Sequence, residues 1–148
     1  MIVKPIGVIS SPFKNRGTAP IQPFQSKAIG KVTVHKKYQK GLTGIDGFSH
    51  IILLYQFHKS KGYDLMVRPY LDDKLKGLFA TRAPRRPNQI GMSVVELVSR
   101  KDNVLTVKGI DALDKSPLLD IKPFVPHFSA RTKVKVGWLE GKLPSVSP

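Results

Sequence analysis

The chain has 148 residues, of which 41% are hydrophobic and 24% charged, so we expect one globular core rather than intrinsic disorder. It contains no cysteine, which excludes a disulfide framework and a cysteine-ligated metal site and favours an intracellular protein. A net charge of +15 favours a polyanionic partner such as nucleic acid, although lysines that only maintain solubility would give the same composition.

The first half of the chain predicts three strands. Residues 3–10 are rich in β-branched side chains and stop at a Ser-Pro pair, whereas residues 13–23 have no periodic apolar face and predict a long loop. Residues 31–36 alternate between apolar and polar, which predicts a strand with one face in water. Residues 50–57 are almost continuously apolar and predict a central strand buried on both faces.

The second half predicts a hairpin and a further strand. Residues 93–98 and 104–107 are apolar runs on either side of the turn-forming cluster at residues 100–103. Residues 132–138 alternate again and predict a half-buried strand. Helical signals are weak, with at most a turn or two near residues 74–78, because 12 glycines and 12 prolines interrupt every longer window.

These elements predict a mainly all-β fold. Short, evenly spaced strands favour a sandwich or a barrel, and we prefer a single compact β-barrel with long functional loops and little helix, because closure removes exposed strand edges. We assign residues 1–142 to this domain and residues 143–148 to a C-terminal tail. No apolar run approaches the ~20 residues of a membrane span and no signal peptide is evident, so we expect a cytoplasmic protein without a membrane partner.

The segment of residues 81–91 is the first candidate for chemistry. It places three arginines among two prolines, and planar, permanently charged side chains on a stiff backbone suit an anionic or nucleotide-like ligand. The alternative is a solvated basic turn. The four histidines do not converge in the sequence, and we predict no metal site.

The segment of residues 109–126 is the second candidate. It combines three aspartates with prolines and an aromatic residue in what looks like one loop-rich connection. Its backbone groups could read the edge of an adenine while Asp120 approaches a reacting amine. An ordinary connection rich in turns is an equally good explanation from these residues alone.

Several motifs together resemble the TsaA family, also called TrmO. Residues 79–93, 110–114 and 117–126 look like its signatures, and residues 6–14 and 47–51 are similar to it as well. The resemblance implies a compact β-barrel that binds S-adenosylmethionine outside the Rossmann architecture, commonly as a homodimer with the cofactor near the interface. It also implies methylation of N6 of threonylcarbamoyladenosine at position 37 of tRNA, next to the anticodon.

The resemblance further implies site residues. It places the cofactor at Gln22, Pro23, His58, Lys59, Arg82, Met92, Ile110, Asp111, Ala112 and Leu113. Arg85, Arg86 and Asn88 would face the RNA or brace the loop. Lys122 would lie near the acceptor, and Asp120 would accept a proton or a hydrogen bond from the reacting amine.

Two positions differ from the family pattern, and two other functions stay open. Gln89 stands where the family usually has proline, and Phe124 stands where it often has tyrosine, so a phenolic hydroxyl is absent there. A basic β-barrel that binds RNA without catalysis would use the same arginines. A methyltransferase that acts on a small metabolite or a protein is the third interpretation.

Overall fold

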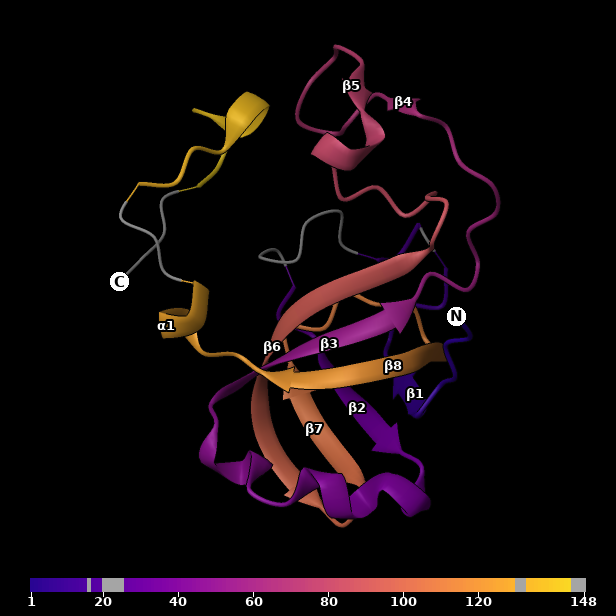
Figure 1. Cartoon of the computed structure of the whole chain (residues 1–148), viewed down its shortest axis with the longest axis vertical. Helices are drawn as coiled ribbons and strands as arrows, with labels where there is room; N and C mark the ends of the chain where they lie inside the picture. Colours follow the sequence, from indigo (N-terminus) through magenta and orange to yellow (C-terminus); the bar gives the residue numbers. More distant parts are fainter. Residues whose placement is uncertain (16, 20–25, 130–132, 145–148) are drawn as a thin grey trace.

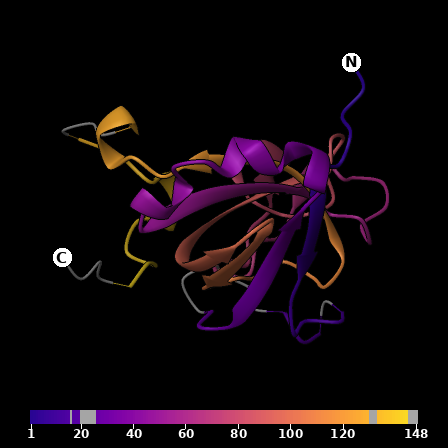
Figure 2. The same cartoon turned by 90° about the horizontal axis from the view of Figure 1, so that it is seen from below.

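The structure is a computed structural model and describes residues 1–15, 17–19, 26–129 and 133–144. Six antiparallel strands close into a barrel in the order β1-β2-β7-β6-β3-β8 (Figure 1). The strands are β1 (Gly7–Ser10), β2 (Ile29–Val34), β3 (His50–Gln56), β6 (Ile90–Lys101), β7 (Val104–Lys108) and β8 (Ser116–Pro123). The strands surround a single interior when seen from below (Figure 2).

The remaining elements are short and lie outside the barrel wall. They are η2 (Lys36–Leu42), η3 (Ile45–Gly47), β4 (Met66–Val67), β5 (Lys76–Gly77), η4 (Leu78–Ala80), α1 (Pro126–Ser129) and η5 (Gly137–Leu139). The η2 segment covers one end of the barrel, whereas residues 62–86, here called the arm, extend from the other end (Figure 1). Within the described ranges, no helix has the length and apolar character needed to cross a bilayer.

The barrel interior is filled by aliphatic side chains from every strand. Alternate residues of each strand point inward, because successive side chains of a strand lie on opposite faces. The fully buried members are Ile9, Val32, Val34, Ile51, Leu53, Val95, Leu105, Val107 and Leu118 from the strands, with Ile110 from the connection after β7. Gly91 in β6 leaves room for the rings of Tyr55 in β3 and of Phe57 just after it, since a Cβ there would lie 2.6 Å from Tyr55 and 2.8 Å from Phe57.

The all-β barrel predicted from the sequence is confirmed, and so are the strands within residues 3–10 and 31–36 and the hairpin between β6 and β7. The strand predicted at residues 50–57 exists as β3, but it is not buried on both faces. Only alternate residues are buried in β3, because its outer face has no covering layer.

Three local predictions are wrong. Residues 133–136 form no strand and residues 137–139 form a short 3₁₀ helix, because the alternating segment finds no strand to pair with among the described residues. The connection predicted at residues 109–126 contains β8, which pairs with both β1 and β3 and closes the barrel. The helical turn expected near residues 74–78 is replaced by β5, and a 3₁₀ turn begins at Leu78.

Candidate functional site

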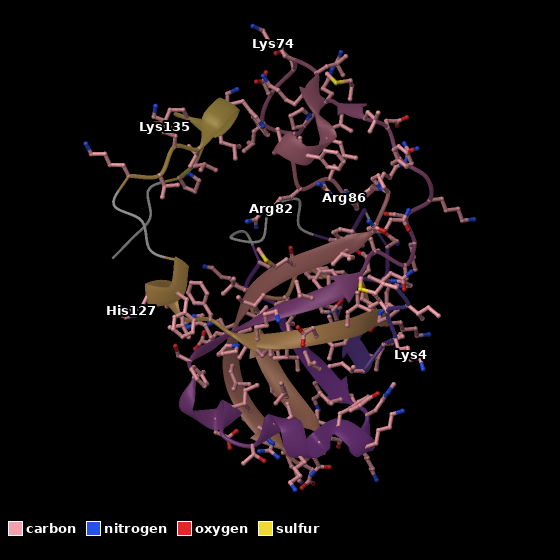
Figure 3. All side chains as sticks on the ribbon, viewed as in Figure 1. Lys4, Lys74, Arg82, Arg86, His127 and Lys135 are labelled. Atoms are coloured by element: carbon pink, nitrogen blue, oxygen red, sulfur yellow. The ribbon has the colours of Figure 1, made fainter. Side chains whose placement is uncertain are left out.

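A cavity of about 1190 Å³ opens at the end of the barrel that faces the arm. Its floor is formed by the end of β3, the start of β6 and the connection between β7 and β8. Its upper wall is formed by the arm and by residues 133–144, here called the C-terminal segment. Arg82 and Arg86 lie between the barrel and the tip of the arm (Figure 3).

Three polar side chains from different parts of the chain form a connected group on the cavity floor. The Tyr55 hydroxyl lies 2.9 Å from the Ser93 Oγ, and the Ser93 hydroxyl donates a hydrogen bond to the Asp111 carboxylate. Burial raises the pKa of Asp111 above its usual range, and the hydrogen bond from Ser93 opposes this only in part. Burial, and then the charge of Asp111, also raises the pKa of Tyr55, so its hydroxyl stays protonated.

Arg82 supplies positive charge above this floor. Its side chain is exposed in the cavity and makes no hydrogen bond or ion pair with another described residue. Its charge lowers the pKa of Asp111 and of Tyr55, although less than burial raises them. A guanidinium that pairs with no described side chain, beside a half-buried carboxylate, can bind an anionic group of a ligand.

The other two arginines of the segment are used differently. Arg86 donates from Nη1 to the carbonyl oxygens of Thr81 and Ala83, both at 3.0 Å, which fixes the turn that presents Arg82. Arg85 points away from the cavity, because it donates to the Asp64 carboxylate at 2.9 Å and to the Lys61 carbonyl at 3.1 Å. The prolines and these contacts together make the segment rigid.

Polar contacts tie together a side wall beside the cavity, and of the residues that make them Lys59 lines the cavity itself. Asp114 accepts hydrogen bonds from the Ser11 backbone at 3.0 Å and from the Lys14 ammonium at 2.8 Å, and these contacts lower its pKa. Lys59 donates to the Lys14 carbonyl at 2.7 Å. These bonds join the loop after β1, the end of β3 and the connection before β8 into one wall.

His58 lies in this wall with an unsatisfied ring nitrogen. Its Nδ1 is buried and has no hydrogen-bond partner among the described residues. Burial, and then the charge of Lys59, lowers the pKa of His58, so the ring is neutral at pH 7. A buried nitrogen without a partner costs free energy, and a polar atom of a ligand in the cavity would remove that cost.

The upper wall joins two distant parts of the chain. The Trp138 Nε1 donates to the Ala80 carbonyl at 2.8 Å, and the Lys142 ammonium lies 2.7 Å from the Asp72 carboxylate. Asp72 also pairs with Lys76 at 3.3 Å. The C-terminal segment is therefore held against the arm, above the open end of the barrel.

The structure brings most of the predicted site residues to this cavity. The predicted residues that line it are His58, Lys59, Arg82, Arg86, Met92, Asp111, Ala112 and Leu113. Ile110 is fully buried in the barrel core, next to the lining residue Asp111. The predicted residues Gln22 and Pro23 lie outside the described residues.

Besides Ile110, four predicted residues do not line the cavity. They are Arg85, Asn88, Asp120 and Lys122. Ile121 packs against the barrel core, so its neighbours Asp120 and Lys122 face outward, where they form an ion pair of 2.9 Å. The roles predicted for these four residues remain predictions.

The sequence prediction missed several residues of the cavity. Tyr55 and Ser93 lie inside predicted strands, and nothing in their spacing shows that their side chains meet Asp111. Tyr70, Phe79 and Trp138 also line the cavity. Phe79 lies two residues before the arginine segment, and this position in the sequence could have indicated an aromatic residue that faces the ligand.

Comparison with known proteins identifies the family of the chain. Residues 8–130 match the tRNA-methyltransferase O N-terminal domain. The chain belongs to the TrmO family. The crystal structure of TrmO from Pseudomonas aeruginosa superposes with a TM-score of 0.77 at 36% identity, covering 95% of this chain and 62% of that one.

Two relatives extend the comparison with the TrmO family. A probable S-adenosyl-L-methionine-binding protein of Pyrococcus abyssi is 53% identical over 138 residues, which cover 93% of this chain and 75% of the relative. A tRNA (adenine(37)-N6)-methyltransferase of Rattus norvegicus is 31% identical over 156 residues, which cover all of this chain and 36% of the relative. The chain thus spans less than two thirds of the Pseudomonas and rat proteins.

Proposed function

We propose that the chain is an S-adenosylmethionine-dependent methyltransferase that modifies N6 of threonylcarbamoyladenosine at position 37 of tRNA. The observation that carries this proposal is the cavity at the barrel end, where an arginine that pairs with no described residue, a half-buried carboxylate and apolar side chains surround one space. The names of the relatives support the cofactor and the adenine substrate. The net charge of +15 supports an RNA partner.

The residues in the cavity fit the chemical groups of the proposed cofactor. Arg82 would bind its carboxylate, and Asp111 would face its positive charges. The buried Nδ1 of His58 has no hydrogen-bond partner among the described residues, and a polar group of the cofactor would supply one. Met92, Ala112 and Leu113 would pack against the adenosine, as apolar side chains commonly do in such pockets.

The chain's own task in this reaction is mainly positioning. When bound, S-adenosylmethionine supplies an activated methyl group. The fixed arginine segment and the joined side wall would hold the acceptor amine in line and exclude water, an effect that can be worth about 7–11 kcal/mol. The proposed mechanism assigns no step to a metal ion.

A carboxylate can accept the proton that the amine loses. Asp111 is the one acidic side chain among the described residues that line the cavity, and its raised pKa makes it a better proton acceptor than an exposed aspartate. Asp120, the residue predicted from the sequence, would instead have to meet the acceptor from the outer face of the barrel. We propose Asp111 as the first candidate and keep Asp120 as the second.

The RNA would approach from the arm. Arg86 lies at the cavity rim, and Arg85 and Asn88 on the exposed side of the same segment would contact phosphates or brace the loop. Lys122, on the outer face of β8, would contact the RNA near the acceptor.

A homodimer in the cytoplasm, where tRNA is available, completes the proposal. Exposed apolar side chains beyond the cavity support a self-contact, and they include Val98 at 52% exposure and Phe128 at 78%. Sedimentation equilibrium would test the dimer. A single species with the mass of one chain at micromolar concentration would contradict it.

The experiment that tests the function is nucleoside mass spectrometry. The protein is incubated with S-adenosylmethionine and tRNA that carries threonylcarbamoyladenosine, and the RNA is digested to nucleosides. We expect a nucleoside heavier by one methyl group at N6. If the protein binds tRNA with steep salt dependence but shows no heat with S-adenosylmethionine, it is a non-catalytic RNA-binding barrel. If it binds the cofactor without methylating RNA, the acceptor is a metabolite or a protein.

A further inference from the structure

The cavity contains aromatic side chains that the proposed cofactor chemistry does not use. Phe79 and Tyr70 line the upper wall and are 76% and 67% exposed. Trp138 lines the same wall from the C-terminal segment. Trp138 is only partly exposed, so two exposed aromatic side chains and one partly exposed tryptophan share this wall, and such a group of rings indicates a ligand surface.

The cavity also has room for more than a cofactor. Its volume of about 1190 Å³ exceeds the roughly 300–1000 Å³ that is usual for a pocket holding one small ligand. The polar group of Tyr55, Ser93 and Asp111 occupies the barrel end, whereas Tyr70 and Trp138 belong to the arm and the C-terminal segment. The upper part is thus chemically distinct from the floor.

Phe79 is arranged as one layer of a stack. The Arg86 guanidinium carbon lies 5.9 Å from the centre of the Phe79 ring, a cation–π contact. Arg86 is itself held by two backbone carbonyls, so it fixes the ring in place. With 76% of Phe79 exposed, much of the ring surface stays available to a planar ligand.

Trp138 is fixed in a similar way. Its Nε1 donates a hydrogen bond to the carbonyl of Ala80, the residue that follows Phe79 in the chain. This hydrogen bond sets the position of the edge of the Trp138 ring. The ammonium groups of Lys76 and Lys142 lie 6.0 and 5.7 Å from its centre. The wall therefore combines fixed aromatic rings with cations, the pairing that binds single-stranded nucleic acid.

We propose that Phe79, Tyr70 and Trp138 form a stacking subsite for a nucleobase of a single-stranded RNA loop, beside the cofactor part of the cavity. The subsite rests on the proposed function, and it would recognise the base that accepts the methyl group. An adenine that reacts at N6 must leave the base stack, and stacking on protein rings replaces the contacts that it loses. The cations of the wall, Arg68 and Arg86 among them, would neutralise the flanking phosphates.

The test measures RNA binding separately from cofactor binding. A labelled anticodon stem-loop that carries threonylcarbamoyladenosine is titrated by fluorescence anisotropy with saturating S-adenosylhomocysteine present. We expect Phe79→Ala and Tyr70→Ala each to weaken binding about ten-fold, and Phe79→Trp to keep it near the wild-type value. Tyr63→Ala is the matched control, because Tyr63 is a half-exposed aromatic residue of the same arm that does not line the cavity.

The protein also carries its own reporter. Trp138 is the only tryptophan, so stacking of a base in the upper wall should quench the intrinsic fluorescence when the stem-loop is added. Unchanged Trp138 fluorescence at saturating RNA would overturn the subsite. Wild-type affinity of Phe79→Ala would do the same, as would equal losses in Phe79→Ala and Tyr63→Ala.

Two further measurements separate this inference from its alternatives. Calorimetry with S-adenosylmethionine should give the same affinity for the wild type and Phe79→Ala. If the wild type shows no heat while Phe79→Ala still loses RNA affinity, the proposed function fails and the subsite stands. If Phe79→Ala dissociates a dimer in sedimentation, and its loss of RNA affinity is fully explained by the loss of the dimer, the aromatic wall is a contact between two copies. That result would refute the subsite.

Discussion

The barrel and the arm distribute their apolar side chains in opposite ways. In the barrel, residues such as Leu53 and Leu105 are completely buried, whereas Leu65, Leu75 and Phe79 of the arm are 59%, 55% and 76% exposed. The arm buries only Leu78 completely and is otherwise held by polar contacts such as those of Asp72. The barrel is thus a scaffold with its own core, and the arm presents apolar surface to a ligand or a partner.

The largest expected effect is on the free energy of unfolding, where a leucine of the barrel is compared with a leucine of the arm. Leu53→Ala should lower the free energy of unfolding by about 2–5 kcal/mol, because it leaves a cavity among fully buried side chains. Leu75→Ala on the exposed arm should change it by less than about 0.5 kcal/mol. Urea unfolding followed by circular dichroism measures both. Similar losses in the two variants would show that the arm has a core of its own.

The second effect concerns the floor of the cavity. Asp111→Asn should reduce turnover about 10²-fold or more, the usual loss when a proton acceptor is removed. Asp120→Asn is the matched variant on the outer face and should keep most of the activity. Turnover is measured with radiolabelled cofactor under single-turnover conditions. The opposite pattern, with activity lost only in Asp120→Asn, would move the reacting centre to the outside of the barrel.

The raised pKa of Asp111 predicts a pH dependence with a defined sign. If the ionised carboxylate is required, activity falls as the pH drops through the raised pKa, above the ordinary value of about 3.9. Stability changes in the other direction, because the folded state holds this proton more tightly and loses stability as the pH rises through the same range. The Tm of Asp111→Asn relative to the wild type should therefore increase with pH across that window. A difference independent of pH would contradict the assignment.

The smallest effect concerns the contact between the arm and the C-terminal segment. Lys142→Ala removes an exposed ion pair with Asp72, and such pairs contribute about 0–1 kcal/mol. We expect little change in global unfolding but faster hydrogen exchange in residues 76–80, which measures local opening. Unchanged exchange there would show that the hydrogen bond from Trp138 alone holds the segment.

The same division separates what the sequence could predict from what it could not. Period-two alternation predicted β2, and two apolar runs around a turn-forming cluster predicted the hairpin of β6 and β7. Each of these strands has one buried face. Alternation failed at residues 133–138, where no described strand pairs with the segment. The sequence prediction also missed β8. Pro117 and Pro123 near its two ends and Asp120 between them are unusual in a strand, and the strand has a bulge where it pairs with β3.

In the candidate site, the sequence predicted the residues that are close together in the chain and missed those that meet only in the fold. The arginine segment is local, so its composition identified it, and Arg82 does line the cavity. The group of Tyr55, Ser93 and Asp111 depends on three strands or connections that meet only in the closed barrel. No spacing along the chain encodes that meeting.

The central claim is that the cavity between barrel and arm binds S-adenosylmethionine, and calorimetry of two neighbouring arginine variants tests it most directly. Arg82→Ala should raise the dissociation constant about ten-fold or more, since a charge-assisted contact with the ligand carboxylate is lost. Arg85→Ala removes the same charge from the same segment but outside the cavity, so it should bind like the wild type. Wild-type affinity in Arg82→Ala, or equal weakening in both variants, would contradict the claim.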